Sequence, residues 1–97
     1  MNIVLPQNGS IVIIDDNPDE AMPIIQALSQ TGVSIRYFKG LDLDSYDVGD
    51  QPVRLCILDL QLFNSNDPHV IISSLLACLG KLISHRNGPY ILLIWSN

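Results

Sequence analysis

The sequence has no long hydrophobic run, no cluster of basic residues and no closely spaced pair of cysteines. A helix that crosses a membrane needs about 20 consecutive apolar residues. The most apolar helical segment, residues 70–83, is interrupted by Ser73, Ser74, Gly80 and Lys81. The N-terminus also lacks the charged region and the apolar core of a signal peptide. We therefore expect no membrane segment.

Basic residues are few, because the chain has 5 Lys and Arg against 10 Asp and Glu and a net charge of -5. Nonspecific binding to nucleic acids or anionic membranes depends on clustered positive charge. We therefore expect no direct contact with nucleic acid. The negative charge is suited instead to a cation or to a basic partner.

Cys56 and Cys78 are the two cysteines, and each lies inside an apolar run without a nearby cysteine or histidine. This placement favours buried, reduced thiols over a disulfide or a metal site. Reduced thiols are typical of cytoplasmic proteins, so we expect that location.

A chain of 97 residues, 47% of them hydrophobic and 15% charged, has the size and composition of one small folded domain. Three nearly continuous apolar runs, at residues 11–14, 53–60 and 90–95, are typical of strands buried on both faces. Residues 33–38 alternate like a half-exposed edge strand. We expect residues 1–10 to form a lead-in and residues 11–97 to form the domain.

Helix signals separate these strands. Asn17 is suited to an N-cap, Pro18 to the first helical position and Glu20 to the capping-box position, and Gly32 supplies a stop. Pro23 leaves open whether this first helix begins at Pro18 or only at Pro23. A second helix is expected after Asp67, from residue 68 to about residue 83.

The segment between the second and third strands, residues 39–52, is expected to be a solvated acidic loop with at most one helical turn. Its aspartates lack the spacing of a calcium-binding loop. The order of strands and helices along the chain predicts an α/β fold with a parallel sheet and right-handed crossovers.

Polar residues follow three of the buried runs. Asp15 and Asp16 follow the first, Asp59 follows the third strand, and Ser96 follows the fourth. In an open α/β sheet, ligands bind beyond the carboxyl ends of the strands, so these side chains can converge there. If the first and third strands are neighbours, we expect Asp16 and Asp59 to lie side by side, with Asp15 adjacent. Neighbouring carboxylates repel one another unless a cation neutralises them, and Mg²⁺ prefers such oxygen ligands. We expect a Mg²⁺ site at this edge.

These residues resemble the receiver domain of two-component response regulators. The resemblance is carried by the Asp15 and Asp16 pair, by Asp59 at a similar separation, and by the hydroxyl of Ser96, and it covers nearly the whole chain from residue 11. It implies a flavodoxin-like parallel sheet, here in the order 2-1-3-4 and truncated before the fifth strand, so that the domain is incomplete at its C-terminal end.

The resemblance also implies a role for each residue. Asp59 would accept a phosphoryl group, Asp16 would bind Mg²⁺ directly, and Asp15 would act mainly through water. The backbone carbonyl of Gln61 would complete the metal ligands, and Ser96 would contact a phosphoryl oxygen and act as the switch. The implied partners are a histidine kinase or phosphotransfer protein, and an effector that either follows this segment or is a separate protein.

The chain departs from the family at several positions. The family's fifth strand ends in a lysine, and no such strand is found by Asn97, so that the fourth strand is left as an open edge on which a homodimer could form. Phe63 stands where the family usually has proline, and Trp95 is bulky for its position. These departures suit a divergent receiver.

Two alternatives to a phosphorylated receiver are considered, a binding module and a phosphatase. A phosphorylation-independent pseudo-receiver would bind partners without chemistry. A haloacid-dehalogenase-like phosphatase would use Asp59 as its nucleophile, but Gln61 stands where that family has a second aspartate. Nucleotide-binding loops are absent from the sequence, and Ser96 lacks the glycine-flanked turn of hydrolase nucleophiles. We therefore expect a signalling module and not an enzyme.

Overall fold

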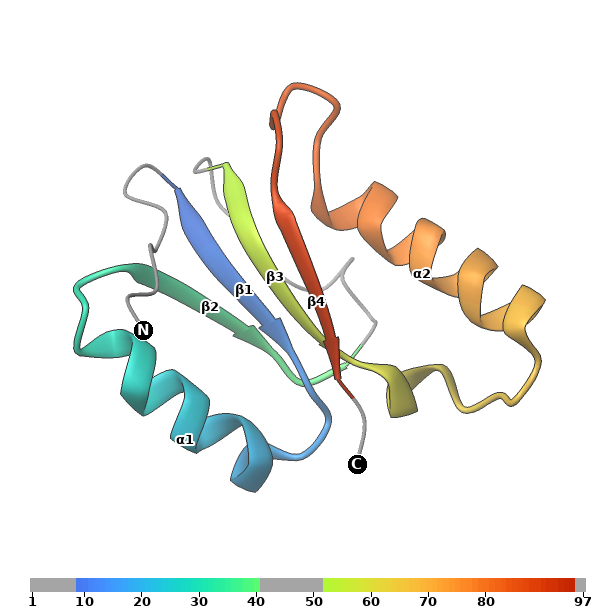
Figure 1. Cartoon of the computed structure of the whole chain (residues 1–97), viewed down its shortest axis with the longest axis horizontal. Coiled ribbons are helices and arrows are strands. Elements are labelled where there is room, and N and C mark those ends of the chain that lie inside the picture. Colours follow the sequence, from blue (N-terminus) through green and yellow to red (C-terminus); the bar gives the residue numbers. More distant parts are fainter. Residues whose placement is uncertain (1–8, 41–51, 96–97) are drawn as a thin grey trace.

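The computed structural model describes residues 9–40 and 52–95 and forms a parallel sheet with helices packed against it (Figure 1). This architecture confirms the predicted α/β class. The strands are β1 (Ser10–Ile14), β2 (Ser34–Phe38), β3 (Val53–Asp59) and β4 (Ile91–Trp95), and the helices are α1 (Pro18–Ser29), the 3₁₀ helix η2 (Leu60–Phe63) and α2 (Pro68–Leu82).

The sheet has the order β2-β1-β3-β4, and every neighbouring pair is parallel. This is the predicted order, and it matches the first four strands of a flavodoxin-like sheet. The chain moves outward from β1 to β2 and then in the other direction from β3 to β4. The point where the direction reverses, between β1 and β3, is where such sheets bind ligands.

Each face of the sheet has its own apolar core, because successive strand residues point to opposite faces. On one face, Ile11 and Ile13 of β1 pack with Ala21 of α1. On the other face, Val12 and Ile14 pack with residues of α2. The two helices therefore cover opposite faces, and their crossovers, which run in opposite directions, have the same hand.

The N-terminal ends of the helices follow the sequence signals. The Asn17 side chain accepts a hydrogen bond of 3.0 Å from the backbone N–H of Asp19, and α1 begins at Pro18. The alternative start at Pro23 is therefore wrong. Pro23 lies inside the helix on its exposed side, where solvent can replace the hydrogen bond that proline cannot donate. Asp67 caps α2, as predicted.

The third strand ends one residue earlier than predicted. Its last residue is Asp59, because Leu60 begins η2, whose first amides are capped by the Asp59 side chain. Residues 41–51 of the predicted acidic loop, and Ser96 and Asn97, lie outside the described residues.

Strand β4 is the edge strand that the sequence predicts. It pairs with β3 alone among the described strands, and the side chains of Ile91 and Leu93 are 66% and 52% exposed. No charged residue interrupts the strand. None of the helices in residues 9–40 and 52–95 combines the length and apolar character needed to cross a membrane.

Candidate functional site

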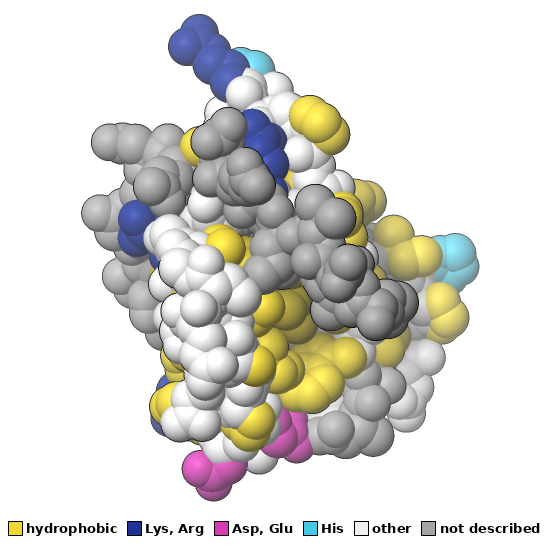
Figure 2. Space-filling view, turned by 60° about the vertical axis from the view of Figure 1, so that its left-hand side comes forward, with side chains coloured by type: hydrophobic (Ala, Val, Ile, Leu, Met, Phe, Trp, Pro, Cys, Tyr) yellow, Lys and Arg dark blue, Asp and Glu magenta, His cyan; other side chains and the backbone are white. Residues whose placement is uncertain are grey.

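The acidic side chains that the structure describes gather at one end of the molecule. Figure 2 shows those in view at one end, with basic side chains mostly toward the other. All the described acidic residues follow the carboxyl ends of β1 and β3 or lie at the starts of the helices beyond them: Asp15, Asp16, Asp19, Glu20, Asp59 and Asp67. Helix N-terminal ends carry partial positive charge, which stabilises carboxylates placed there.

The alternation of strand residues decides which carboxylates meet. Ile14 of β1 is in register with Leu58 of β3, so Asp15 and Asp59 are the next pair along the two strands. Both residues continue the series that packs under α1. Asp15 and Asp59 are therefore brought together on the α1 face. The prediction that Asp16 lies beside Asp59 is wrong, because Asp15 is the residue level with Asp59 and the next residue along the chain points away from that face.

Asp15 is held rigidly at the end of β1. Its side chain is 0% exposed, and its Oδ1 accepts a hydrogen bond of 2.9 Å from the backbone N–H of Asn17. Its backbone N–H donates to the carbonyl of Phe38, and its carbonyl accepts a hydrogen bond of 2.7 Å from the Tyr37 hydroxyl. These contacts to β2 fix the position of the Asp15 carboxylate.

Asp59 is held in a similar way at the end of β3. Its side chain is 2% exposed, and its Oδ1 accepts a hydrogen bond of 3.0 Å from the backbone N–H of Gln61. Within the described residues, the second oxygen of each aspartate, Oδ2 of Asp15 and Oδ2 of Asp59, is buried and has no hydrogen-bond partner. Buried polar atoms nearly always have partners, so these two oxygens are suited to a ligand.

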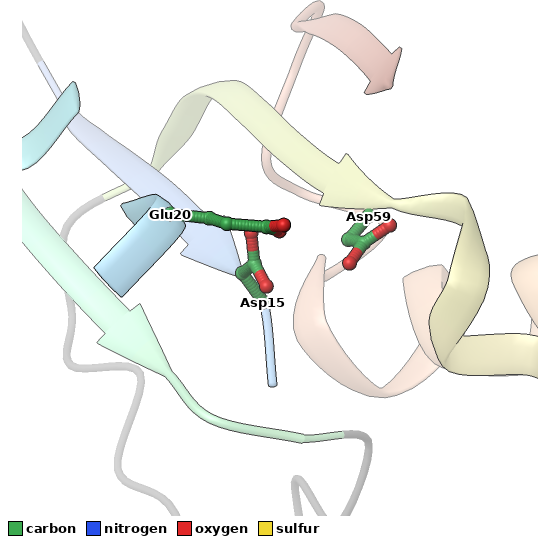
Figure 3. A group of neighbouring side chains, drawn as sticks. All are labelled: Asp15, Glu20 and Asp59. Carbon is green, nitrogen blue, oxygen red and sulfur yellow. The ribbon is translucent and has the colours of Figure 1, made fainter. Parts of the chain in front are cut away.

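Glu20 completes the group. One carboxylate oxygen from each of Asp15, Glu20 and Asp59 lies within 4.8 Å of the others, and Figure 3 shows the Glu20 side chain reaching from α1 toward the two aspartates. The sequence prediction named Glu20 only for helix capping. The sequence does show that Glu20 lies in the first helical turn after Asp15. Whether its side chain reaches Asp15 depends on the angle at which α1 leaves the sheet, and that angle is set by packing.

Asp16 and Gln61 lie beside this group and line a different space. Asp16 is exposed and, together with residues of η2 and the loop that follows, borders a hollow of about 740 Å³. Its other lining residues are Leu60, Gln61, Asn64, Ser65, Asn66 and Ile71. The predicted metal ligands are thus divided between a buried carboxylate group and a polar hollow next to it. The predicted contact by Ser96 falls outside the described residues.

The electrostatics of the group favour a cation. Burial raises the pKa of the Asp15 carboxyl, the hydrogen bond from Asn17 partly opposes this shift, and the negative charges of Asp59, Glu20 and Asp16 raise the pKa further. A divalent cation would relieve both the burial penalty and the repulsion. The donors are all carboxylate oxygens, which are the ligands that Mg²⁺ and Ca²⁺ prefer. The residues therefore fit the predicted Mg²⁺.

No protein-family model matches the chain, and neither a curated protein nor a solved structure shows a significant match to it. The function is therefore inferred from the residues of this chain and their geometry.

Proposed function

We propose that this chain is a receiver-type signalling module in which Asp59 accepts a phosphoryl group in the presence of Mg²⁺. The observation that carries the proposal is how the two oxygens of the Asp59 carboxylate are bonded and buried. Its Oδ1 accepts a hydrogen bond from the Gln61 backbone amide, while its Oδ2 is buried and has no hydrogen-bond partner among residues 9–40 and 52–95, at the end of the sheet where such folds bind ligands. A nucleophilic carboxylate needs a fixed orientation and one unshared oxygen, and Asp59 has both.

The reaction transfers a phosphoryl group from a nitrogen or oxygen atom of the donor to a carboxylate oxygen of Asp59. A carboxylate oxygen of Asp59 forms a bond to phosphorus, and the bond between phosphorus and the donor breaks. The electron pair of that bond leaves with the donor. The donor is the imidazole of a phosphohistidine, which takes up a proton from solvent, or the acyl oxygen of a small phosphodonor, which leaves as a carboxylate. Phosphoryl transfer depends mainly on positioning and electrostatic stabilisation, which buried, fixed side chains can supply.

Charge explains why a metal is part of the proposal. The incoming phosphoryl group is negative, and it would meet Asp15 and Glu20 beside Asp59. Mg²⁺ would offset the negative charge of the acidic residues and of the phosphoryl oxygens. Asp15 would hold the ion through its Oδ2, which has no partner among the described residues, and Asp59 would give one carboxylate oxygen to the ion and the other to the phosphoryl group. Asp16 and Gln61 line the hollow beside this group.

The partners follow from this chemistry. A histidine kinase or phosphotransfer protein would supply the phosphoryl group, and an effector would receive the signal. The hollow beside Asp16 is lined by polar and apolar residues of η2, the following loop and α2, and we propose that the phosphodonor docks there.

The direct test is incubation of the protein with Mg²⁺ and a small acyl phosphodonor, followed by intact-mass measurement. We expect addition of one phosphoryl group that requires Mg²⁺ and is lost in Asp59→Asn. The matched control is Asp67→Asn, which removes the same charge from an exposed helix cap and should be modified like the wild type. Absence of modification in the folded wild type, or equal modification of Asp59→Asn, would contradict the proposal.

A phosphorylation-independent pseudo-receiver is the second candidate. The exposed apolar side chains of Ile91 and Leu93 favour it, because an open sheet edge can bind a partner without any chemistry at Asp59. An unmodified wild type that nevertheless bound a partner, with binding lost on Leu93→Lys and retained in Asp59→Asn, would support this second function.

A further inference from the structure

Glu20 occupies a position that the resemblance to receiver domains does not assign to the metal. It lies in the first turn of α1 and is half-buried, and its carboxylate reaches over the end of the sheet toward Asp15 and Asp59 (Figure 3). The three carboxylates come from three elements, β1, α1 and the end of β3. Their convergence is therefore produced by the tertiary fold and not by one local turn.

The unpartnered oxygens supply an independent indication of a ligand. Oδ2 of Asp15 and Oδ2 of Asp59 belong to side chains that are 0% and 2% exposed, and neither has a hydrogen-bond partner within the described residues. Burial without a partner is costly for a carboxylate oxygen. A third carboxylate beside them increases the repulsion, so the arrangement is favourable only when positive charge lies between the three groups.

We propose that Asp15, Glu20 and Asp59 together bind one hard divalent cation and that Glu20 is a direct ligand. The inference rests on the proposed function in using the same site, but it concerns the ligand set. Metal–oxygen distances are about 2.0–2.1 Å for Mg²⁺ and about 2.3–2.6 Å for Ca²⁺, so ligand oxygens on opposite sides of an ion lie about 4.0–4.2 Å apart around Mg²⁺ and about 4.6–5.2 Å apart around Ca²⁺. The oxygens of the group all lie within 4.8 Å of one another, which falls in the range for Ca²⁺ and needs only a small inward movement of the side chains for Mg²⁺.

The ligand set differs from the one implied by the resemblance. Asp16 would be the direct ligand there, but its parity places it away from the α1 face, and it is exposed. Three carboxylates also carry more negative charge than the one or two that usually hold Mg²⁺. The site should therefore bind a cation in the absence of any phosphoryl group, and binding should tie α1 to the ends of β1 and β3.

The test is calorimetric titration of the full chain with MgCl₂ and, separately, with CaCl₂. We expect Glu20→Gln to weaken binding of the preferred ion at least about tenfold, as loss of groups that hold or orient metal ligands does. The matched control is Asp19→Asn, which removes the same charge from the neighbouring exposed position of α1 and should change the affinity less than about twofold. Asp16→Asn should weaken binding less than Glu20→Gln.

Glu20→Asp separates ligation from simple charge, because it keeps the charge and shortens the side chain. We expect it to weaken binding as well, although the net charge is unchanged. Circular dichroism without metal verifies that each variant is folded. Wild-type affinity in both Glu20 variants would overturn the proposal, and so would equal losses in Glu20→Gln and Asp19→Asn or a wild type that binds neither ion.

The two proposals can fail separately. If Asp16→Asn abolishes binding while Glu20→Gln does not, and Asp59 is still phosphorylated, Glu20 is not a ligand but the receiver function stands. If the three carboxylates bind the ion and Asp59 is never modified, the ligand set is supported and the receiver function is not.

Discussion

Replacing Asp59 with asparagine should make the metal-free protein more stable and the metal-loaded protein less stable than the wild type. The oxygens of the carboxylate group lie within 4.8 Å of one another, and at that distance two negative charges repel by about 0.9 kcal/mol at the dielectric constant of water and about 3.5 kcal/mol at an effective value of 20. Asp59→Asn removes two such pairs and keeps an oxygen that can accept from the Gln61 amide. Because proton uptake limits the repulsion, we expect a net gain of about 1–3 kcal/mol at pH 8.

A cation at high concentration should reverse this order. An ion that binds only the folded wild type stabilises it by about 4.1 kcal/mol at a concentration 1,000 times its dissociation constant, which exceeds the gain of about 1–3 kcal/mol expected for Asp59→Asn without metal. Asp59→Asn, which lacks one of the ligands, should gain much less from the ion. In a domain of this size, a stabilisation of about 4.1 kcal/mol corresponds to a rise of about 15–30 °C in the melting temperature of the wild type.

The pH dependence has a defined sign. The raised pKa of Asp15 means that the folded state holds a proton more tightly than the unfolded state, whose pKa is near 3.8. The ionised Asp15 therefore lowers the free energy of unfolding. This destabilisation is greatest above the folded-state pKa, decreases as the pH falls through that pKa, and is gone below about pH 3.8. The advantage of Asp15→Asn over the metal-free wild type should therefore be largest at high pH and vanish in acid.

Urea denaturation with a chelator or with excess MgCl₂, at pH 8 and at lower pH, measures the free energies of unfolding. Thermal denaturation under the same conditions measures the melting temperatures. The reasoning would be refuted if Asp59→Asn were less stable than the wild type in chelator at pH 8, or if Mg²⁺ stabilised both proteins equally. Asp67→Asn is the control, since its exposed carboxylate lies outside the group.

Three further predictions concern the frame around the site. Asn87→Ala should lower the free energy of unfolding, measured in urea, by about 2–4 kcal/mol. The buried Asn87 amide hydrogen-bonds both the N–H and the carbonyl of Val53, and both groups would lose this partner. A loss below about 0.5 kcal/mol would contradict this. Tyr37→Phe should cost about 0.5–1.5 kcal/mol by removing the hydrogen bond to the Asp15 carbonyl, with unchanged stability as the contrary result. Cys56, whose pKa burial raises to about 12, should react with a thiol reagent only after unfolding, and rapid labelling of the native protein would contradict its burial.

The strands and helices could be predicted because local signals and packing agree. Residues 11–14 are apolar at every position, and the structure buries that strand on both faces. Asn17 and Asp67 cap helices where the sequence placed them. The 3₁₀ helix η2 was not predicted, because its apolar residues resemble a continuing strand and only the capping contact of Asp59 distinguishes it.

The site was predicted in part. Carboxylates do meet at the ends of β1 and β3, but the residue beside Asp59 is Asp15, whereas the sequence was interpreted as placing Asp16 there. That information was present in the alternation of β1 and β3 once their register is known. Glu20 could not be assigned, because its position depends on how α1 packs on the sheet.

Asn87 illustrates a contact that no local pattern predicts. The sequence indicates a turn after α2, and Asn87 does lie in that turn. Its side chain, however, bonds the backbone of Val53, 34 residues earlier in the chain. Such contacts depend on the finished fold.

The central claim is that the buried carboxylates at the ends of β1 and β3 bind a divalent cation. The most direct measurement is a titration of the folded chain with Mg²⁺, followed by the fluorescence of Trp95, which is the single tryptophan and is in register with Asp59. We predict a saturable change that is lost in both Asp15→Asn and Asp59→Asn and retained in Asp67→Asn. No change in fluorescence, together with a silent calorimetric titration, or the same change in all four proteins, would contradict the claim.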